Sequence, residues 1–404
     1  MSKKARFGLA LAVALLGPLF AGPAAAALLG VPEGHETIAA ALAAASYGDT
    51  VSLADGNYFE HDLVLPPGVA LIGRSGIRDA VVIDALGAGR VLWGEELNEA
   101  NLLESLTLRG GYLYSGYGCG AYLDGAVSLR NLVVEDNSSI GGRGIGVYAF
   151  LPSLIEDCVL RNNRSSSEGS LGGGLAVHPR WGGNCTLRRV DFIGNEAASG
   201  AAIYVWASSQ IFIDSIRVLQ NLGLSAIMLY NGEASGASPT FLLENSLIAG
   251  NSGTGISANA SGTIRNCTIA DCRSGIVSAG NSASDCYVLI ENCIVTGSYD
   301  PNGFGGITSW YNGQQGYPDV YCSDVYKNLP TNYSGMFDQT GLNGNISVDP
   351  RFCTGAGPEE YPLRKDSPCA PANNTCGVLI GAFPVGCEAT ATEETSWSRI
   401  KSLY

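Results

Sequence analysis

The sequence predicts an all-β solenoid, in which short parallel strands stack coil upon coil around a long hydrophobic core. Three observations lead to this prediction: one short pattern recurs along the chain, a second pattern lies between its copies, and glycine is abundant, with 54 residues. Each copy is too short to bury its own apolar face, so stacking of successive copies is needed to close a core. An all-β sandwich is the alternative, but strands every 8–12 residues or so do not predict recurrence at the length of a coil.

The first pattern is an aliphatic residue followed by polar residues and then by apolar residues, and it often ends in asparagine. Its copies end at intervals of 21–32 residues and lack the periodicity of a helix. The copies are SLRNLVVEDN (128–137), LIEDCVLRNN (154–163), TLRRVDFIGN (186–195), FIDSIRVLQN (212–221), LLENSLIAGN (242–251), TIRNCTIADC (263–272) and LIENCIVTGS (289–298).

The second pattern is a small residue followed by an aliphatic one. Parallel stacking in register places like residues above like at about 4.8 Å, so the aliphatic members predict a continuous internal column. The abundant glycines suit the tight turns that each coil needs. The pairs are Gly120–Ala121, Gly144–Ile145, Gly174–Leu175, Ala202–Ile203, Ala226–Ile227, Gly255–Ile256, Gly275–Ile276 and Gly306–Ile307.

The outer side of the same strands carries aromatic residues. Side chains alternate between the two faces of a strand, so in SGAAIYVWA (199–207) Tyr204 and Trp206 face away from the core. Aromatic rings in a row suit the apolar faces of sugar rings, and the coil rise is similar to one sugar unit. We therefore expect an extended polysaccharide to bind here; the alternative is that the rings pack under neighbouring turns and only protect the sheet. The ligand-binding candidates are Asp124, Tyr148, His178, Arg180, Trp181, Tyr204, Trp206, Tyr230 and Trp310.

Several segments resemble secreted right-handed parallel β-helix proteins of the pectate-lyase-like superfamily. Residues 37–76 resemble their entry segment, whereas 344–353 and 367–387 resemble their closing segment. FIGNEAASGAAI (192–203) resembles the repeats of polymorphic outer-membrane proteins, with Ser199 in place of a glycine. The resemblance implies a right-handed parallel β-helix, for which we expect about ten coils. It implies no single activity, because this fold carries lyases, hydrolases, esterases and non-catalytic adhesins.

The N-terminal segment predicts export. A basic start, a short apolar run and small residues near Ala26 indicate a signal peptide over 1–27; a membrane anchor is the alternative, but the run is short for a spanning helix. Residues 28–50 form a capping segment, in which ETIAAALAAAS (36–46) predicts an amphipathic helix with Ile38 and Leu42 towards the first coil.

The remaining divisions are a β-helix over 51–347, a cysteine-rich cap over 348–387 that closes the far end, and a linker and tail over 388–404. Bare strand edges at the ends of a solenoid invite aggregation, which is why both ends need covering. The tail places Trp397, Ile400 and Leu403 at helical spacing, which suits a sorting or docking peptide; a frayed terminus is the alternative.

The charge balance excludes several partners. Without the signal peptide the chain has 20 Lys and Arg against 37 Asp and Glu, a net charge of −17. Such a surface repels nucleic acid and anionic membranes, and it disfavours polyuronates unless Ca²⁺ bridges the two. We expect a monomer with no transmembrane span, located extracellularly, on a bacterial cell surface or in the periplasm, with a polysaccharide or cell-surface glycan as partner.

The cysteines suggest disulfides in the C-terminal cap, because the chain is exported. The disulfide candidates are Cys353, Cys369, Cys376 and Cys387, and their connectivity stays open. Zinc is the alternative, but the spacings contain no Cys-x-x-Cys pair. Three further cysteines, Cys158, Cys267 and Cys293, occupy equivalent coil positions and are expected in the core.

Asparagines also occupy equivalent coil positions. Asn131, Asn245, Asn266 and Asn292 predict a ladder of side-chain amides at a bend.

Catalysis is the rival to simple recognition. A Ca²⁺-dependent polysaccharide lyase needs calcium carboxylates beside a base; Asp124 and Glu168 are the nearest acids, and Arg143 and Arg180 the nearest bases, but they form no convincing cluster. Residues 55–62 and 300–303 offer calcium-like oxygens that turn chemistry explains better. Among the histidines, His178 alone lies on the aromatic face.

A glycoside hydrolase is less well matched by the sequence, since it needs paired carboxylates. Polygalacturonases carry an Arg-Ile-Lys motif, but here Arg399-Ile400-Lys401 falls in the tail, and we interpret it as coincidence. The leading hypothesis is an adhesin-like protein that recognises an extended polysaccharide, with catalysis unproven and Ca²⁺ as the one candidate cofactor. A structural spacer that binds no glycan is the third hypothesis.

Overall fold

The computed structural model describes residues 25–178, 184–207, 210–231, 240–280, 284–311, 314–353 and 361–388, except for the side chains of 151–153 and 207. Most of the predicted signal peptide, the tail beyond Glu388, and the binding candidates Arg180 and Trp181 therefore lie outside the described residues.

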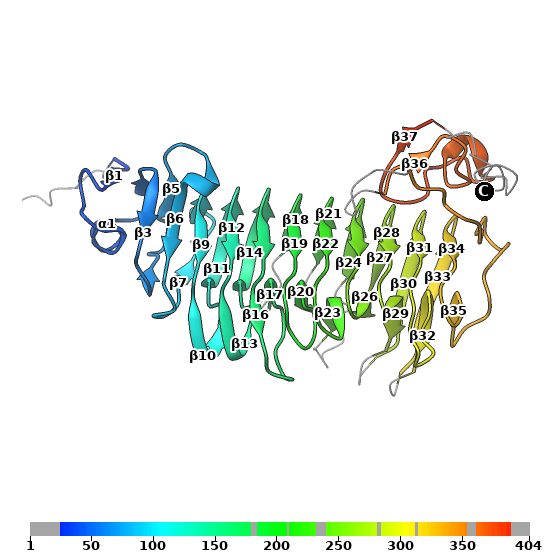
Figure 1. Ribbon diagram of the computed structural model, residues 1–404. Coiled ribbons are helices and arrows are strands. Elements are labelled where there is room, and N and C mark those ends of the chain that lie inside the picture. The colour runs from blue at the N-terminus through cyan, green and yellow to red at the C-terminus, as the bar shows by residue number, and fades with distance from the viewer. Residues whose placement is uncertain are drawn as a thin grey trace, which may run out of the picture.

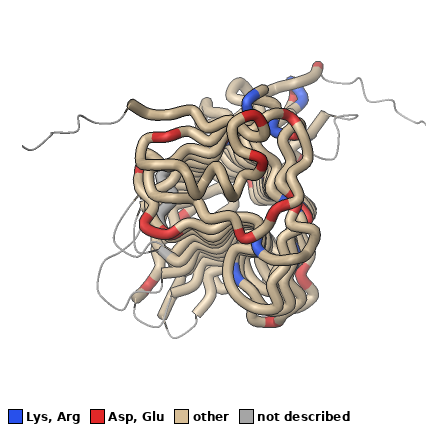
Figure 2. Tube along the Cα trace, turned by 90° about the vertical axis from the view of Figure 1, so that its left-hand side faces the viewer, with Lys and Arg blue, Asp and Glu red and all other residues tan. Residues whose placement is uncertain are grey.

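The described chain is a parallel β-solenoid, as the sequence predicts (Figure 1). Viewed from the N-terminal end, successive coils superimpose closely (Figure 2). It has about 13 turns, and one of its sheets alone has 11 strands, so the expected number of about ten coils was too low. The coils before residue 112 stack in the same way although they lack the asparagine-ended pattern.

Each coil contributes strands to three rows. The first row contains β4 (Leu63–Val64), β7 (Leu92–Leu97), β11 (Ala121–Arg130), β14 (Val147–Glu156), β17 (Leu175–Val177), β20 (Ile203–Ala207), β23 (Ser225–Asn231), β26 (Thr254–Asn259), β29 (Ser274–Ala279), β32 (Ile307–Trp310) and β35 (Tyr333–Ser334). The second row contains β1 (Leu28–Val31), β2 (Thr50–Leu53), β5 (Ala70–Gly73), β8 (Leu102–Glu104), β18 (Cys185–Arg188), β21 (Ile211–Asp214), β24 (Thr240–Glu244), β27 (Ser261–Arg265), β30 (Cys286–Glu291) and β33 (Gly316–Tyr321). These two rows form one 21-stranded sheet, because β11 and β14 run through both.

The third row is a separate sheet. It contains β3 (Gly56–Tyr58), β6 (Val81–Asp84), β9 (Thr107–Arg109), β12 (Val133–Glu135), β15 (Val159–Arg161), β19 (Asp191–Ile193), β22 (Arg217–Leu219), β25 (Leu247–Ala249), β28 (Thr268–Ala270), β31 (Ile294–Thr296) and β34 (Asp324–Tyr326). A small sheet of β10 (Tyr112–Tyr117), β13 (Ser138–Arg143) and β16 (Arg164–Ser165) lies between the third and first rows along the chain. The short elements η1 (Arg78–Ala80) and η2 (Pro371–Asn373) complete the set with α1, β36 and β37, described below.

The predicted capping helix is confirmed. Helix α1 (Ile38–Ala44) buries Ile38, Ala41 and Leu42 against the first coil. It begins at Thr37, whose side-chain oxygen accepts a hydrogen bond of 3.1 Å from the backbone nitrogen of Ala40, the usual way to satisfy a donor at a helix start. The helix thus covers the apolar end of the solenoid.

Buried asparagines join the coils through the interior. The last residue of the first sequence pattern turns inward at the bend after the third row. The amide nitrogens of the first four such asparagines each donate to the amide oxygen of the asparagine in the next coil at 2.9–3.1 Å. These asparagines are at most 2% exposed. We call them the inner asparagine ladder: Asn137, Asn163, Asn195, Asn221 and Asn251.

The predicted outer ladder is present at the other bend, between the second and third rows. Asn292 donates to Asn266 at 3.1 Å and Asn266 donates to Asn245 at 3.2 Å, whereas Asn131 donates to the hydroxyl of Ser105 instead. All four asparagines have φ between 49° and 54°. Asparagine tolerates this left-handed conformation better than most residues, which explains its recurrence at the bend.

The cysteine-rich segment is placed differently from the prediction. It lies along the side of the solenoid, on the outer face of the third row, with β36 (Leu363–Arg364) and β37 (Val385–Cys387) beside its last strands (Figure 1). Tyr361 and Phe383 pack on an apolar patch of this row, which consists of Leu219, Leu247, Ala249 and Ala270. The end of the core is contacted instead by Met336, which follows β35.

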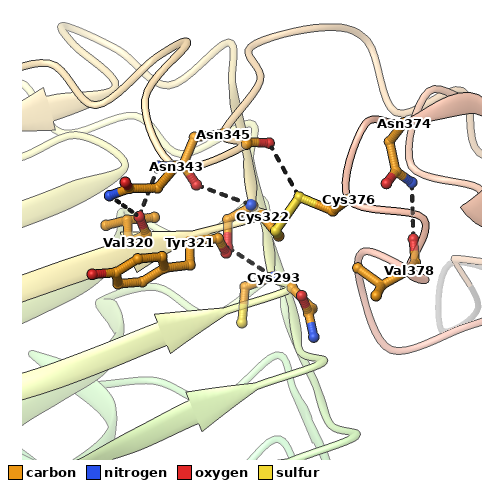
Figure 3. Close-up of a disulfide and its surroundings, with 12 residues drawn as sticks. Cys293, Val320, Tyr321, Cys322, Asn343, Asn345, Asn374, Cys376 and Val378 are labelled. Atoms are coloured by element: carbon orange, nitrogen blue, oxygen red, sulfur yellow. Dashed lines mark hydrogen bonds between the residues drawn. A yellow bond between two sulfur atoms is a disulfide. The ribbon is translucent and has the colours of Figure 1, made fainter.

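Three of the four disulfide candidates are in disulfides, but the prediction for Cys369 was wrong. Cys353 bonds Cys387, whereas Cys376 bonds Cys322 at the end of β33 (Figure 3). Cys369 is a buried thiol whose sulfur lies 3.3 Å from the carboxylate of Asp324. The sequence could not show this, because Cys322 belongs to the solenoid and only the folding-back of the C-terminal segment brings it to Cys376.

The cysteines predicted for the core are confirmed there. Cys158, Cys267 and Cys293 are thiols of at most 2% exposure. Burial raises the pKa of Cys158 to about 12, so this thiol stays protonated and unreactive near neutral pH.

Candidate functional site

The outer face of the first row carries two columns of side chains in register along the axis. One column runs through Trp93, Tyr122, Tyr148, Ala176, Tyr204 and Met228. In the other column, Trp206 is paired with Tyr230, and Tyr230 with Asn259. Stacking in register therefore turns residues far apart in the chain into neighbours on one surface.

The predicted register was wrong in one coil. Val147 pairs with Ala121, so the small–aliphatic pair of this coil is Gly146–Val147 and not Gly144–Ile145. Tyr148 consequently lies in the column of Tyr122 and Tyr204, two residues from its expected position. A glycine is required at 146 because a Cβ atom there would lie 2.5 Å from the carbonyl oxygen of Gly174.

Rings from both columns form a continuous row, which we call the aromatic row. Consecutive ring centroids lie 5.2–6.2 Å apart, within the range in which aromatic pairs attract. Tyr204 joins the row beside Trp206 at 6.5 Å. The members are Trp93, Tyr122, Tyr148, Phe150, His178, Tyr204, Trp206 and Tyr230.

The row is accessible at its two ends and covered in its centre. Tyr148, Phe150 and Tyr204 are only 5–8% exposed. The ring of Tyr117 from β10 lies 4.7 Å from the ring of Tyr148. Trp93, Tyr122, Trp206 and Tyr230 are partly exposed. The covered centre agrees with a packing role for those rings, whereas the two ends present ring surface to solvent.

Polar groups lie at the first end of the aromatic row and beside its centre. The guanidinium of Arg90 lies 6.0 Å from the ring centroid of Trp93 and 5.4 Å from that of Tyr122, which is cation–π geometry. Arg143 and His178 line a crevice of about 10 Å³ with Tyr204 and Trp206, which is room for about one water molecule. The crevice is therefore too small to enclose anything larger than water.

The centre of the aromatic row is a buried environment that disfavours charged groups. Burial raises the pKa of Tyr204 to about 12, with the nearby Tyr230 acting in the same direction and Arg143 opposing it. The hydroxyl of Tyr204 therefore stays protonated at physiological pH and is a hydrogen-bonding group, not a base.

The other candidates are dispersed. Asp124 lies in β11 beside the register shift that follows Leu123. Trp310 is 46% exposed and pairs with Ala279, three coils beyond Tyr230, where its ring contacts Phe304. The structure brings together Tyr148, His178, Tyr204, Trp206 and Tyr230, and leaves Trp310 apart.

Four members of the site were not among the ligand-binding candidates: Arg90, Trp93, Tyr122 and Phe150. Phe150 was missed because of the register error, and the Gly146–Val147 pair is the signal that would have found it. Trp93 and Arg90 were missed because no small residue precedes Leu92 in VLW (91–93), so the small–aliphatic pattern is absent there. Only the pairing of β7 with β11 shows that Leu92 and Trp93 occupy the same positions as Ala121 and Tyr122.

The two calcium-like segments use their oxygens in structural hydrogen bonds. Glu60 accepts from the backbone nitrogens of Ile38 and Ala39 at the start of α1, at 2.8 and 2.9 Å. Asp300 is buried and accepts from Ser274 and from the backbone of Asn302. Within the described parts of the chain, no three His, Cys, Asp or Glu side chains are grouped to hold a metal ion.

A solenoid of parallel coils with a ring-lined outer face defines the class of protein. The family model for a right-handed β-helix region matches residues 231–317. The chain therefore has the right-handed parallel β-helix fold. No curated protein and no solved structure matches the chain significantly. Among the described residues, no helix is both long and apolar enough to cross a membrane.

Proposed function

We propose that this protein is an exported, monomeric β-helix protein that binds an extended polysaccharide along the aromatic row. The observation that carries the proposal is the uninterrupted series of ring contacts from Trp93 to Tyr230, on one outer face of six successive coils. A row of rings on a rigid sheet is a preorganised surface for a repeating ligand.

The spacing of the coils supports a polymer as the ligand. From Trp93 to Tyr230 there are five coil steps of about 4.8 Å, or roughly 24 Å in all. This length accommodates about four or five sugar units. The two accessible ends, Trp93 with Tyr122 and Trp206 with Tyr230, then contact different units of one chain, so that two weak contacts add through a common backbone.

The charge favours a neutral polysaccharide. The chain carries 37 Asp and Glu against 23 Lys and Arg, which disfavours acidic polymers in the absence of a bridging cation. Arg90 does not reverse this preference, because its side chain is half-buried and its guanidinium already lies over two rings.

The test is a glycan array followed by calorimetry with the purified mature chain and a Trp206→Ala/Tyr230→Ala variant. We expect a neutral glycan of at least four units to bind, and the variant to lose at least tenfold in affinity while its circular dichroism is unchanged. Unchanged affinity in the folded variant would remove the proposal, and absence of binding to every glycan would favour a structural spacer.

The same preparation distinguishes recognition from a lyase. Acidic and neutral polysaccharides are incubated with the protein and Ca²⁺, and ultraviolet absorbance records new unsaturated ends. We expect no increase. A signal that a chelator abolishes would establish the lyase in place of non-catalytic recognition.

A further inference from the structure

A second aromatic surface lies on the second row, away from the aromatic row. Tyr287 in β30 and Tyr317 in β33 pair in register, with ring centroids 5.1 Å apart and planes at 13°. They are 60% and 47% exposed, in contrast to the largely covered centre of the aromatic row. Two stacked rings with this much exposed surface are available to a ligand.

The two rings line an open cleft with a volume of about 560 Å³. Leu289, Asp319 and Gln339 also line it, the last from the loop after β35. This volume is within the usual range for small-molecule sites, about 300–1,000 Å³. The cleft is therefore large enough for one or two sugar units.

In the preceding coil, the position next to Tyr287 is occupied by a small residue, Ser261. The hydroxyl of Ser261 accepts a hydrogen bond of 3.0 Å from the backbone nitrogen of Tyr287, and so lies against the strand rather than over the ring. Among the described residues, the stack of rings therefore begins at Tyr287 and continues to Tyr317.

The cleft combines this apolar surface with polar groups. A carboxylate oxygen of Asp319 accepts a hydrogen bond of 3.1 Å from the hydroxyl of Tyr321, which fixes the carboxylate while leaving further acceptor sites. The amide nitrogen of Gln339 donates to the carbonyl oxygen of Phe337 at 3.1 Å. Two oriented polar side chains thus lie beside two exposed rings.

We propose that this cleft binds a neutral pyranose unit, stacked on Tyr287, with hydroxyl groups directed to Asp319 and Gln339. The C–H bonds on one side of a pyranose ring suit the negative face of an aromatic ring, and sugar hydroxyls suit a carboxylate acceptor. Asp319 disfavours a uronic acid by charge repulsion. The site is on another row of the solenoid, so it does not depend on polysaccharide binding at the aromatic row.

The probes are cellohexaose, xylohexaose, mannohexaose and maltohexaose, with hexagalacturonate as the acidic comparison. Acetylation of tyrosines by N-acetylimidazole, followed by mass spectrometry, measures the accessibility of Tyr287 and Tyr317 directly. The measurement is made on the full chain and on the Trp206→Ala/Tyr230→Ala variant, so that the two surfaces are read separately.

We expect one of the neutral hexasaccharides to reduce acetylation of Tyr287 at least threefold in both proteins. Calorimetry in the double-variant background is expected to show at least a tenfold loss of affinity on Tyr287→Ala. The matched control is Tyr47→Ala, which removes another exposed ring (71% exposed) outside the cleft. Asp319→Asn tests whether the Asp319 carboxylate accepts a hydrogen bond from the ligand, and we expect a smaller loss of affinity than for Tyr287→Ala.

Three results would overturn the proposal. They are no protection of Tyr287 by any neutral hexasaccharide at millimolar concentration, unchanged affinity in the folded Tyr287→Ala protein, and protection by hexagalacturonate alone. Each of these outcomes is measured at Tyr287 itself, in a background that lacks the Trp206 and Tyr230 end of the aromatic row, so none of them bears on the proposal for that row.

Discussion

The side-chain amide of Asn163 donates a hydrogen bond of 3.0 Å to the side-chain oxygen of Asn195 in the next coil. The same oxygen accepts from the backbone nitrogen of Asn163, and the amide nitrogen of Asn195 donates to Leu160 and Asn221. All four hydrogen-bonding positions of the Asn195 amide are therefore occupied in a site of 0% exposure.

Replacement of this amide should be costly. Asn195→Leu leaves donors and acceptors of three neighbours buried without their partner, at about 1–3 kcal/mol for each such group. We expect a loss of about 2–4 kcal/mol in the free energy of unfolding, measured by denaturant titration. The control Asn57→Ala changes an exposed asparagine and should alter stability by no more than about 0.5 kcal/mol. Equal losses in the two variants would contradict the ladder's role.

The left-handed backbone conformation of Asn266 at the outer bend leads to a prediction about stability. Asn266 has φ of 51° and hydrogen-bonds Asn245 and Asn292. Asn266→Ala loses both amide contacts and forces alanine into the left-handed region, at roughly 1–2 kcal/mol for the backbone alone. Asn266→Gly loses the amide contacts, but glycine adopts the left-handed conformation without strain. The Tm of this variant should therefore lie between those of the wild type and the alanine variant. A glycine variant less stable than the alanine variant would contradict this account.

Asp324 predicts a pH dependence of stability. Its carboxyl is buried beside Cys369 of the C-terminal segment, and this burial raises its pKa to about 7. A hydrogen bond from the backbone of Val348 acts in the opposite direction. Because the pKa is higher in the folded state, the stabilising contribution of this carboxyl is complete below about pH 4. The free energy of unfolding then falls as the pH rises towards 7, with a slope of at most about 1.4 kcal/mol per pH unit.

Asp324→Asn keeps the size and removes the titration. Denaturant unfolding of both proteins between pH 4 and 8 should show the wild type losing stability relative to the variant as pH rises. A constant difference between the two curves would show that Asp324 does not titrate in this range.

The Cys322–Cys376 disulfide should hold the C-terminal segment on the solenoid. It spans 54 residues of sequence, for which the chain-entropy model gives about 4 kcal/mol. In Cys376→Ser we expect faster proteolysis within residues 348–387, measured by mass spectrometry, while the solenoid retains its circular dichroism. The matched variant Cys353→Ser opens a loop within the segment itself and should have a smaller effect on its attachment. Cleavage of the solenoid at the same rate would contradict separate attachment.

The aromatic row should divide into structural and binding rings. Tyr148 is 6% exposed and packs on Tyr117, Tyr122 and Phe150, so Tyr148→Ala should cost about 3 kcal/mol of stability, as for other buried aromatic truncations. Trp206→Ala at the accessible end should cost less than half as much and should weaken glycan binding more. Thermal unfolding and calorimetry on both variants test the division, and it would be contradicted if the order were the same in both measurements.

The parts of the fold that could be predicted are those encoded by a periodic sequence pattern. Recurrence of SLRNLVVEDN-like segments indicated stacked coils, and the stripe of Ile38 and Leu42 indicated the capping helix, because both follow from local burial patterns. The same repeat ends in residues such as Asn195, yet their burial and bonding were not predictable, since an asparagine at a bend suits solvent as well as an interior ladder.

Residues of the aromatic row could be placed correctly only in coils whose strand register was clear from the sequence. Counting from Ile203 and Ile227 placed Tyr204, Trp206 and Tyr230 correctly on one face. Two adjacent glycine–aliphatic pairs, at 144 and 146, made the register of Tyr148 ambiguous, and a shift of two residues keeps the same face while changing the column. Only the pairing of Val147 with Ala121 resolves it.

The sequence by itself determined the solenoid, its helical cap, the buried thiols and the aromatic character of one face, because each depends on residues that repeat at the length of a coil. The tertiary structure alone decided which rings are covered, that the C-terminal segment lies on the third row, and that Cys322 and not Cys369 is oxidised. These depend on contacts between segments that do not repeat, such as Tyr361 with Asp271. No periodic signal records such contacts, because they form only once the chain has folded back on itself.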